Sequence, residues 1–513
     1  MLLADVVATS AAVGATRSRT AKARAIADLL GTAEVAEVGP VTAWLSGETV
    51  QGRVGVGWKR LSASRSRPAA APGLAVGEVD ATLAELAVTS GAGSEARRDV
   101  MLAGLLGAAT AAEQDFLVRL LTGELRHGAL EGVMLDAVAT AAAVPPAVLR
   151  RAFMLSGSLP AVAATALRGG EEALAAVALE VGRPLRPMLA SPGSSLEEAM
   201  ASLGDDVTVE HKLDGARIQV HRDGGTVRVW TRTLREVTDG VPELAEQVRA
   251  LPCTTAVLDG ETLALDDDGR PRAFQDTMSR FGSDPTGRGP DEAVVLSPFF
   301  FDLLHLDGRD LLDEPLHVRL DALAGLLADE RHAPLRMLGT RRPTPEQAAQ
   351  VLEDALAAGQ EGVVVKDLSA PYAAGRRGKA WQKVKPVHTL DLVVIGAEHG
   401  FDRRTGSLSN IHLGARDPDG GEPVMVGKTF KGMTDELLAW QTETFPRHAR
   451  TTEEWGLLLR PELVVEVALD GAQRSVRYPG GVALRFARVL RYRPDKTAAE
   501  ADTLDAVRAL LPG

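Results

Sequence analysis

Two prolines, Pro184 and Pro187, mark the point at which the hydrophobic pattern of this 513-residue chain changes. Proline cannot continue a helix and pushes the residue before it toward an extended conformation, so residues 182–188 are predicted to form an extended linker. Before the linker, residues 1–175 carry Ala, Leu and Val at helical spacing, broken by Gly-Pro and Gly-Ser pairs. This part is therefore predicted to be all-α.

After the linker, apolar residues alternate with polar ones, which is the pattern of a half-buried strand. Ile218 and Val220 precede residues 223–225, an Asp-Gly-Gly turn, and Val227 and Val229 follow it. Two alternating runs around a short glycine-containing turn predict a β-hairpin. A strand-rich part of the chain is thus expected to begin here.

A helix is predicted to interrupt these strands after Thr344, which can cap it, with Pro345 in the first helical position and Gln347 as the capping-box partner. Gly359 is expected to end it before an apolar strand. The middle of the chain therefore mixes helices with sheet. From Leu390 onward, the runs LDLVVIGA, PVMVGKTF and LVVEVALD are separated by Gly and Asp turns. They predict a small barrel or sandwich, followed by a final helix after Lys496.

The bulk composition excludes several classes of protein. The chain has no run of roughly 18 apolar residues that could span a membrane, and its apolar N-terminus lacks the basic start of a signal peptide and contains Asp5. We therefore expect a cytoplasmic protein. The single cysteine, Cys253, excludes an intramolecular disulfide and a multi-cysteine zinc site. The formal net charge is −12, so binding to a polyanion would need local cationic surface. Basic residues cluster in residues 17–24, 53–67 and 376–385.

Residues 210–217, with the sequence EHKLDGAR, place Lys212 between two carboxylates, Glu210 and Asp214, just before Arg217. Alone, such a K-x-D-G segment is far more often an exposed turn lysine with a charged neighbour than a catalytic one. Further motifs follow in order: LDGE at 258–261, FFFD at 299–302, EGVVVK at 361–366 and WQKVK at 381–385. Together these five motifs resemble the nucleotidyltransferase motifs of ATP-dependent DNA ligases, from about Pro184 to Lys496.

The resemblance implies a fold and a reaction. It implies a helical DNA-binding domain over residues 1–178, an α+β nucleotidyltransferase (adenylation) domain with antiparallel sheets over 179–387, and an OB-fold β-barrel over 388–513. Lys212 would take AMP from ATP, pass it to the 5′-phosphate at a nick, and leave the 3′-hydroxyl to displace it. Because attack on phosphorus needs an uncharged amine, the site must favour the neutral form of the lysine.

Two glutamates in these motifs, Glu261 and Glu361, are carboxylates at predicted strand ends, suited to holding Mg²⁺ through a few oxygen contacts. The resemblance assigns metal binding to both, and places Glu261 near the nucleotide as well; the simpler interpretation of each is a surface glutamate. Lys383 and Lys385 alternate along a predicted strand and point to one face, where they can neutralise phosphate oxygens. Otherwise they form a solvated strand face.

The nucleotide itself would be held by other motif residues. Alternation places Phe299 and Phe301 on one face of their strand, so the residues alone do not choose the ring that stacks on adenine. The resemblance selects Phe301 and puts Glu210 at the adenine edge. A core phenylalanine is the alternative for Phe301.

Arginines complete the set that the resemblance implies. Arg217 and Arg232 match residues that contact ribose or phosphate, and Arg377 matches a further arginine near the nucleotide, with Arg376 as its close rival.

Two further motifs, one in the helical part of the chain and one near its end, resemble ligase motifs more weakly. Residues 123–130, GELRHGAL, resemble the glycine-containing turn by which eukaryotic-type ligases approach the DNA backbone, which makes Arg126 and Gly128 candidate DNA contacts. His127 replaces a usually apolar residue, and a plain helix–helix connection is the alternative. Residues 484–496 resemble the terminal motif of the ligase OB-fold, in which Pro494 departs from the expected charged residue.

The resemblance also implies the partners: ATP as AMP donor, Mg²⁺, and nicked double-stranded DNA encircled by a monomer. It does not separate replication from repair or recombination. RNA ligases and guanylyl-transferring capping enzymes share the core motifs but mostly lack the helical domain. NAD-dependent ligases are disfavoured because a chain with one cysteine cannot form their zinc cluster. A catalytically inactive nucleic-acid-binding scaffold is disfavoured by the presence of Lys212, both glutamates and the two lysines.

Overall fold

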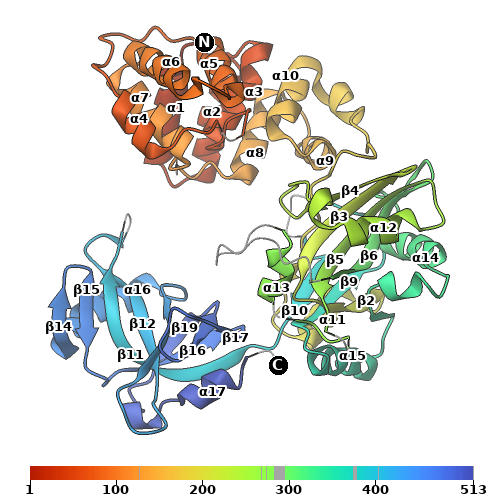
Figure 1. Ribbon diagram of the computed structural model, residues 1–513, viewed down its shortest axis with the longest axis vertical. Helices are drawn as coiled ribbons and strands as arrows, with labels where there is room; N and C mark the ends of the chain where they lie inside the picture. Colours follow the sequence, from red (N-terminus) through yellow and green to blue (C-terminus); the bar gives the residue numbers. More distant parts are fainter. Residues whose placement is uncertain are drawn as a thin grey trace.

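The computed structural model describes residues 1–511 except 53, 126, 267–268, 273, 282–294, 374–377 and 402–403. Three regions follow one another along the chain, and each has a hydrophobic core of its own (Figure 1). The helical region lies at the top of the view, the central region at the right and the C-terminal region at the lower left. Among the described residues, no helix is long and apolar enough to cross a membrane.

The N-terminal region is built from helices, as its hydrophobic spacing predicts. Several begin at polar caps: the side chain of Thr110, for example, accepts a hydrogen bond from the backbone N–H of Glu113, whose carboxylate bonds back. Their buried faces form one core around Trp44, which is fully buried. The helices are α1 (Leu3–Ala15), α2 (Arg19–Leu30), α3 (Val35–Leu45), α4 (Trp58–Ser64), α5 (Val76–Val88), α6 (Ser94–Ala108), α7 (Ala111–Thr122), α8 (Glu131–Ala141), α9 (Pro146–Ser156) and α10 (Leu159–Ala175).

The central region contains two five-stranded sheets. The strands are β1 (Ser191–Pro192), β2 (Val207–Lys212), β3 (Ala216–Asp223), β4 (Thr226–Thr231), β5 (Thr255–Ala264), β6 (Leu296–Leu306), β7 (Arg309–Asp310), β8 (Gly339–Arg341), β9 (Gly362–Asp367) and β10 (Trp381–Val384). One sheet has the order β1-β10-β9-β2-β8 and the other β4-β3-β5-β6-β7. The pairings are antiparallel as predicted, apart from the two-residue β1, which runs parallel to β10. The predicted hairpin is β3–β4.

Helices cover the outer faces of the two sheets. They are α11 (Leu196–Leu203), α12 (Pro242–Arg249), α14 (Leu316–Leu326) and α15 (Pro345–Ala357), whereas α13 (Phe274–Ser279) packs against β5. The helices α12 and α14 share a core with β3–β6, whereas α11 and α15 share one with β2, β9 and β10. Helix α15 has the predicted capping box between Thr344 and Gln347. A further core lies between the sheets, so the inner faces meet there and leave room for a site.

The C-terminal region is rich in strands, which confirms that part of the prediction. They are β11 (His388–His399), β12 (Leu408–Ala415), β13 (Val424–Thr429), β14 (Ala449–Glu453), β15 (Gly456–Leu459), β16 (Val464–Leu469), β17 (Gly471–Arg474), β18 (Val482–Arg485) and β19 (Arg488–Tyr492), with helices α16 (Asp435–Thr444) and α17 (Leu504–Arg508). Within the described residues, seven of these strands form one sheet, and β17 pairs only with β18. The described pairings do not close this sheet, so an OB-fold barrel stays a prediction. The expected final helix is α17.

Candidate active site

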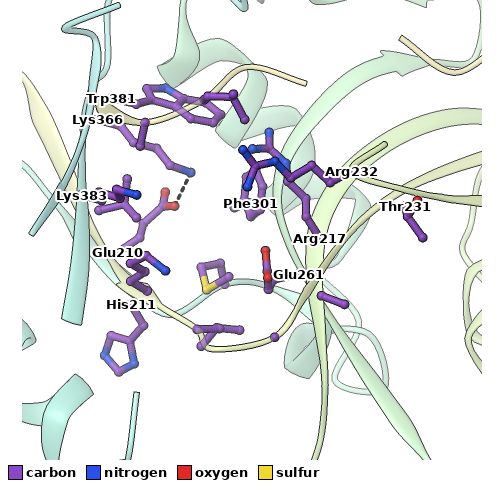
Figure 2. A pocket seen from close by; sticks show the side chains of 18 of the residues that line it. Glu210, His211, Arg217, Thr231, Arg232, Glu261, Phe301, Lys366, Trp381 and Lys383 are labelled. Carbon is purple, nitrogen blue, oxygen red and sulfur yellow. Dashed lines mark ion pairs between the residues drawn. The ribbon is translucent and has the colours of Figure 1, made fainter. Parts of the chain in front are cut away.

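A cavity of about 810 Å³ lies between the two central sheets. Its walls come from β2, β9 and β10 on one side and from β3, β4, β5 and β6 on the other. Figure 2 shows Glu210, Lys366 and Lys383 on one wall, with Phe301, Arg217 and Glu261 facing them. The five sequence motifs thus meet in one place, although they are spread over residues 210–385.

Lys212 is the last residue of β2, at one end of this cavity. It lies two residues after Glu210, and alternation along the strand turns both side chains toward the cavity. A tight connection leads from Lys212 to β3. Gly215 is needed there, because a Cβ atom at this position would lie 2.4 Å from the carbonyl oxygen of Thr262. The glycine of the K-x-D-G motif therefore lets the lysine-bearing turn approach β5.

Glu361 brings together three cationic side chains. Lys212 forms an ion pair with it, Lys385 lies 2.6 Å from the same oxygen, and Arg485 of the C-terminal region lies 3.7 Å from the other. Burial alone would raise the pKa of this carboxyl, but the Lys212 ammonium and hydrogen bonds to the carboxylate lower it. Glu361 is therefore a carboxylate held in its charged form directly beside the predicted nucleophile.

Asp214 joins the same cluster from the K-x-D-G motif. Its two oxygens accept hydrogen bonds from Arg485 at 2.7 and 3.2 Å. Burial raises the pKa of Asp214, and the neighbouring charge of Glu361 adds to this effect. An arginine from the C-terminal region thus reaches a motif of the central region, a contact that the sequence interpretation did not include.

Glu261 lies inside β5, directly opposite Arg217 on β3. The prediction that it stands at a strand end is wrong. In the sequence, Gly260 suggests a turn, but in the structure it allows β6 to lie close to β5. A Cβ atom at this position would lie 2.8 Å from the carbonyl oxygen of Phe299. Burial raises the pKa of Glu261 to about 7, although Lys212 and Arg217 act in the opposite direction.

The far end of the cavity is aromatic and holds a buried ion pair. Lys366 lies 2.5 Å from Glu210, and the two side chains are only 3% and 7% exposed. The Lys366 Nζ atom lies 4.2 Å from the ring centre of Phe301 and 4.5 Å from that of Trp381 (Figure 2). The alternation along β6 is as expected, with Phe300 in the outer core and Phe301 on the cavity wall. Sequence reasoning assigned no role to Lys366, although it ends a quoted motif.

The remaining residues that were predicted to bind the nucleotide do not all line the cavity. Arg217, Arg232 and Lys383 line the cavity, whereas Lys385 lies one residue beyond the end of β10 and contacts Glu361 instead. Arg376 and Arg377 lie outside the described residues, as does Arg126.

The end of the predicted terminal motif binds within its own region. Arg493 and Lys496 both pair with Asp391, at 3.1 and 2.5 Å, and Arg493 also pairs with Asp495 at 2.7 Å. Among the described contacts, Arg485 is the residue of this motif that reaches the central region, at Asp214 and Glu361.

This chain matches models of known protein families in three places. The model described as ATP dependent DNA ligase domain matches residues 187–385, which carry the cavity and all five motifs. The DNA ligase N terminus model matches residues 20–139, and the ATP dependent DNA ligase C terminal region model matches residues 404–496. The three matches cover most of the chain. It belongs to the ATP-dependent DNA ligase family.

Individual relatives agree with the family. The chain is 63% identical to a probable DNA ligase of Rhodococcus jostii (strain RHA1) over 514 residues, and 61% identical to one of Nocardia farcinica (strain IFM 10152) over 528 residues; each match covers 100% of both chains. A solved structure named Pmar-Lig_PreS3 matches with a TM-score of 0.60 and 17% identity, over 95% of this chain and 99% of that chain. At this identity the match shows a shared fold alone.

In this ATP-dependent DNA ligase family member, the residues that could hold Mg²⁺ are carboxylates at the Lys212 end of the cavity. Among the described residues, no group of three or more His, Cys, Asp or Glu side chains could enclose a metal ion. Mg²⁺ does not require such a group, because it is commonly held by one or two carboxylates together with substrate phosphates and water. Glu261 and Glu361 interact electrostatically across the Lys212 end of the cavity and supply two such carboxylates. The residues therefore fit a metal that arrives with a nucleotide.

The glycine-containing turn of the helical region connects α7 to α8, and its predicted contact with DNA stays a prediction. Gly123 ends α7, and Gly128 has a backbone φ of +79°. Lys22 of α2 reaches this turn, where its Nζ donates a hydrogen bond of 2.6 Å to the carbonyl oxygen of His127. A Cβ atom on Gly128 would lie 2.7 Å from the same Nζ. A cationic side chain from one helix and an exposed glycine turn thus lie together on the surface.

Proposed function

We propose that this chain is an ATP-dependent DNA ligase that seals nicks in duplex DNA, with Lys212 as the residue that carries AMP. The observation that carries the proposal is the position of Lys212. It stands at one end of a nucleotide-sized cavity, paired with Glu361 and close to Lys385, while the other end is lined by Phe301 and Trp381. A phosphate-binding end and a base-binding end are what a nucleotide requires.

The first step joins AMP to the lysine. The Lys212 Nζ loses a proton and attacks the α-phosphorus of ATP, so that a P–N bond forms and the P–O bond to pyrophosphate breaks. Lys383 on the cavity wall and Lys385 beside Glu361 provide positive charge for the phosphate oxygens. Glu261 and Glu361 would hold Mg²⁺, which when bound supplies further positive charge to those oxygens.

The next two steps transfer AMP and close the nick. An oxygen of the DNA 5′-phosphate attacks the phosphorus of the lysine-bound AMP, which forms a P–O–P linkage and releases the Lys212 amine. The 3′-hydroxyl then attacks the 5′-phosphorus, loses its proton and expels AMP, which leaves a phosphodiester bond. The same cluster of charges around Glu361 serves each displacement at phosphorus.

The base end of the cavity supports adenine as the base. Glu210 is a buried hydrogen-bond acceptor and fits the exocyclic amine of adenine, whereas the oxygen that guanine carries at this position would face a carboxylate. Phe301 is proposed to stack on the base. Arg217 and Arg232 are proposed to contact ribose or phosphate, as is Arg377.

Each region is assigned one part of the task. We infer that residues 1–178 form a DNA-binding domain, residues 179–387 the nucleotidyltransferase domain and residues 388–513 an OB-fold domain that grips DNA. Figure 1 shows the three regions arranged along a curve, and we infer that a single chain encircles duplex DNA with them. Because the whole chain is acidic, this grip depends on local cations such as Lys22.

The turn at Gly128 yields a prediction for DNA binding. Gly128→Ala is expected to weaken binding to nicked duplex DNA roughly fivefold to tenfold, because the new methyl group meets Lys22 and the backbone has positive φ. Lys22→Ala is expected to weaken it similarly and to reduce the slope of log affinity against log salt by about 1. Fluorescence anisotropy at several salt concentrations measures both. Arg168→Ala, an exposed cation on α10, is the control, and an equal loss there would contradict the specific role of the turn.

The proposed function is tested by mass spectrometry of purified protein incubated with ATP and Mg²⁺. We expect one added AMP on the peptide that contains Lys212, and ligation of a nicked DNA duplex. GTP in place of ATP, and an RNA nick in place of DNA, distinguish this activity from those of capping enzymes and RNA ligases. An adduct at another residue, or none, would refute the proposal.

A further inference from the structure

One face of β3 carries three polar side chains at alternating positions: Arg217, Gln219 and His221. Such side chains on a central strand require partners, because a buried polar group without a hydrogen bond is costly. Gln219 is 4% exposed and His221 is 2% exposed. Their partners come from the linker, residues 182–188, which crosses this face of the strand.

The side chains of Gln219 and His221 bind the backbone of the linker at two positions. The backbone of Leu185 both donates to Gln219 at 2.8 Å and accepts from it at 3.0 Å. The N–H of Gly182 donates to Nδ1 of His221 at 2.9 Å, so the ring proton lies on the other nitrogen, which faces Gln219. Burial lowers the pKa of His221 to about 3, in keeping with a neutral ring. The linker is thus fixed along the strand that carries Arg217.

The linker ends at a buried tyrosine, Tyr372, which is 2% exposed. Its hydroxyl accepts a hydrogen bond from the N–H of Met188 at 3.0 Å and donates its proton to Asp259 at 2.6 Å. Asp259 is 1% exposed and accepts two further hydrogen bonds from Arg217, at 3.0 and 2.6 Å. One hydroxyl therefore connects the end of the linker to the carboxylate that holds Arg217.

This network determines which way the guanidinium of Arg217 faces. Asp259 occupies Nε and Nη2, and the hydroxyl of Tyr372 lies 3.5 Å from Nη2. Within the described part of the chain, Nη1 forms no hydrogen bond or ion pair, and the side chain lines the cavity 5.2 Å from the ring centre of Phe301. A rigid fork with one nitrogen left over can donate from that nitrogen to a ligand oxygen.

We propose that Tyr372 is a positioning residue for nucleotide binding: it holds Asp259, and through it Arg217, in the orientation that meets the nucleotide, and it makes that orientation depend on the bound linker. This inference rests on the proposed function, in which ATP occupies the cavity. Tyr372 itself touches no substrate. Its effect passes through Arg217, and this separates it from a residue that only packs in the core.

Tyr372→Phe tests the proposal because it removes only the hydroxyl. The ring still packs against Trp381, at 6.0 Å between centres. Asp259 then loses one of its three donors and Met188 loses its acceptor, so Arg217 is held less firmly. We expect the KM for ATP in self-adenylylation to rise about tenfold with kcat changed less than twofold, and calorimetry to give AMP binding weakened to the same extent.

Tyr492→Phe is the matched control. The hydroxyl of Tyr492 also donates a hydrogen bond to a side chain, that of Gln441 at 3.0 Å, but Tyr492 lies in the C-terminal region. It should leave the KM for ATP unchanged. Equal KM values for the two variants would overturn the inference, as would a fall in kcat alone.

A double-mutant cycle with Arg217→Lys identifies the route of the effect. If Tyr372 acts through Arg217, Tyr372→Phe has almost no further effect on the KM once Arg217 is replaced. Additive effects would overturn the inference. If the wild-type protein neither binds AMP nor forms a lysine adduct, both the proposed function and this inference are wrong. If the wild type is active but the effects of the two substitutions on the KM are additive, only the inference is wrong.

Discussion

Lys212→Arg protein is expected to form no covalent adduct with AMP, a loss of at least about 10⁴-fold in self-adenylylation. Arginine keeps the positive charge and can keep the ion pair with Glu361, so the charge balance of the cluster is preserved. It cannot act as the nucleophile, because the guanidinium stays protonated at any pH that the protein tolerates. Labelled AMP on denaturing gels measures the loss, and detectable adduct in the variant would contradict the assignment of Lys212.

Lys428→Arg is the matched control for this experiment. Lys428 also forms an ion pair with a glutamate, Glu398, but on the sheet of the C-terminal region. Its replacement should leave self-adenylylation within about twofold. Supplying a nick that already carries AMP on its 5′-phosphate should restore sealing by Lys212→Arg, because the last step does not use the amine. Failure of that rescue would mean that the variant is damaged beyond its nucleophile.

Local signals explain why much of the fold was predictable. The capping box at Thr344 and the two glycines after Asp223 are encoded within a few residues, and both appear in the structure. The helical region was evident from spacing and the linker from its two prolines. Such features depend on the chemistry of neighbouring residues and need no knowledge of the rest of the chain.

The order of the motifs was enough to predict which residues belong to the site. Only the packing of the strands shows which of these residues line the cavity. Lys212, Glu361 and Phe301 were grouped by resemblance, and the structure brings them to one cavity. Phe299 and Phe301 were equivalent by alternation; the structure puts Phe301 alone on the cavity wall. Gly260 led to the wrong prediction of a strand end at Glu261, because glycine occurs both in turns and where two strands approach closely. Here it allows β6 to approach β5.

The contacts between segments far apart in the chain were not predicted from the sequence. Lys366 pairs with Glu210 over 156 positions only because β9 lies beside β2. Arg485 reaches Asp214 across 271 positions and between two regions of the chain. Tyr372 reaches Met188 over 184 positions. Neither alternation nor spacing states which strands will be neighbours, so these pairings become visible only in the folded chain.

Glu361→Gln is expected to slow self-adenylylation by about 10²–10³-fold. The carboxylate balances Lys212, Lys385 and Arg485, and an amide cannot replace its charge. Without the carboxylate, these three cations repel one another, and the Lys212 amine and the phosphates are no longer held in the geometry that the reaction needs. The rate of AMP incorporation at saturating ATP measures the effect.

Glu398→Gln is the control, because Glu398 also accepts from three groups, Lys428, His412 and Asn410, at a distance from the cavity. The dependence on Mg²⁺ then separates the two roles assigned to Glu361. A carboxylate that holds the metal makes the variant need at least about tenfold more Mg²⁺ for half-maximal rate. If Glu361 only balanced the lysines, the rate would fall while the Mg²⁺ requirement stayed at the wild-type value, and the metal assignment would pass to Glu261 alone.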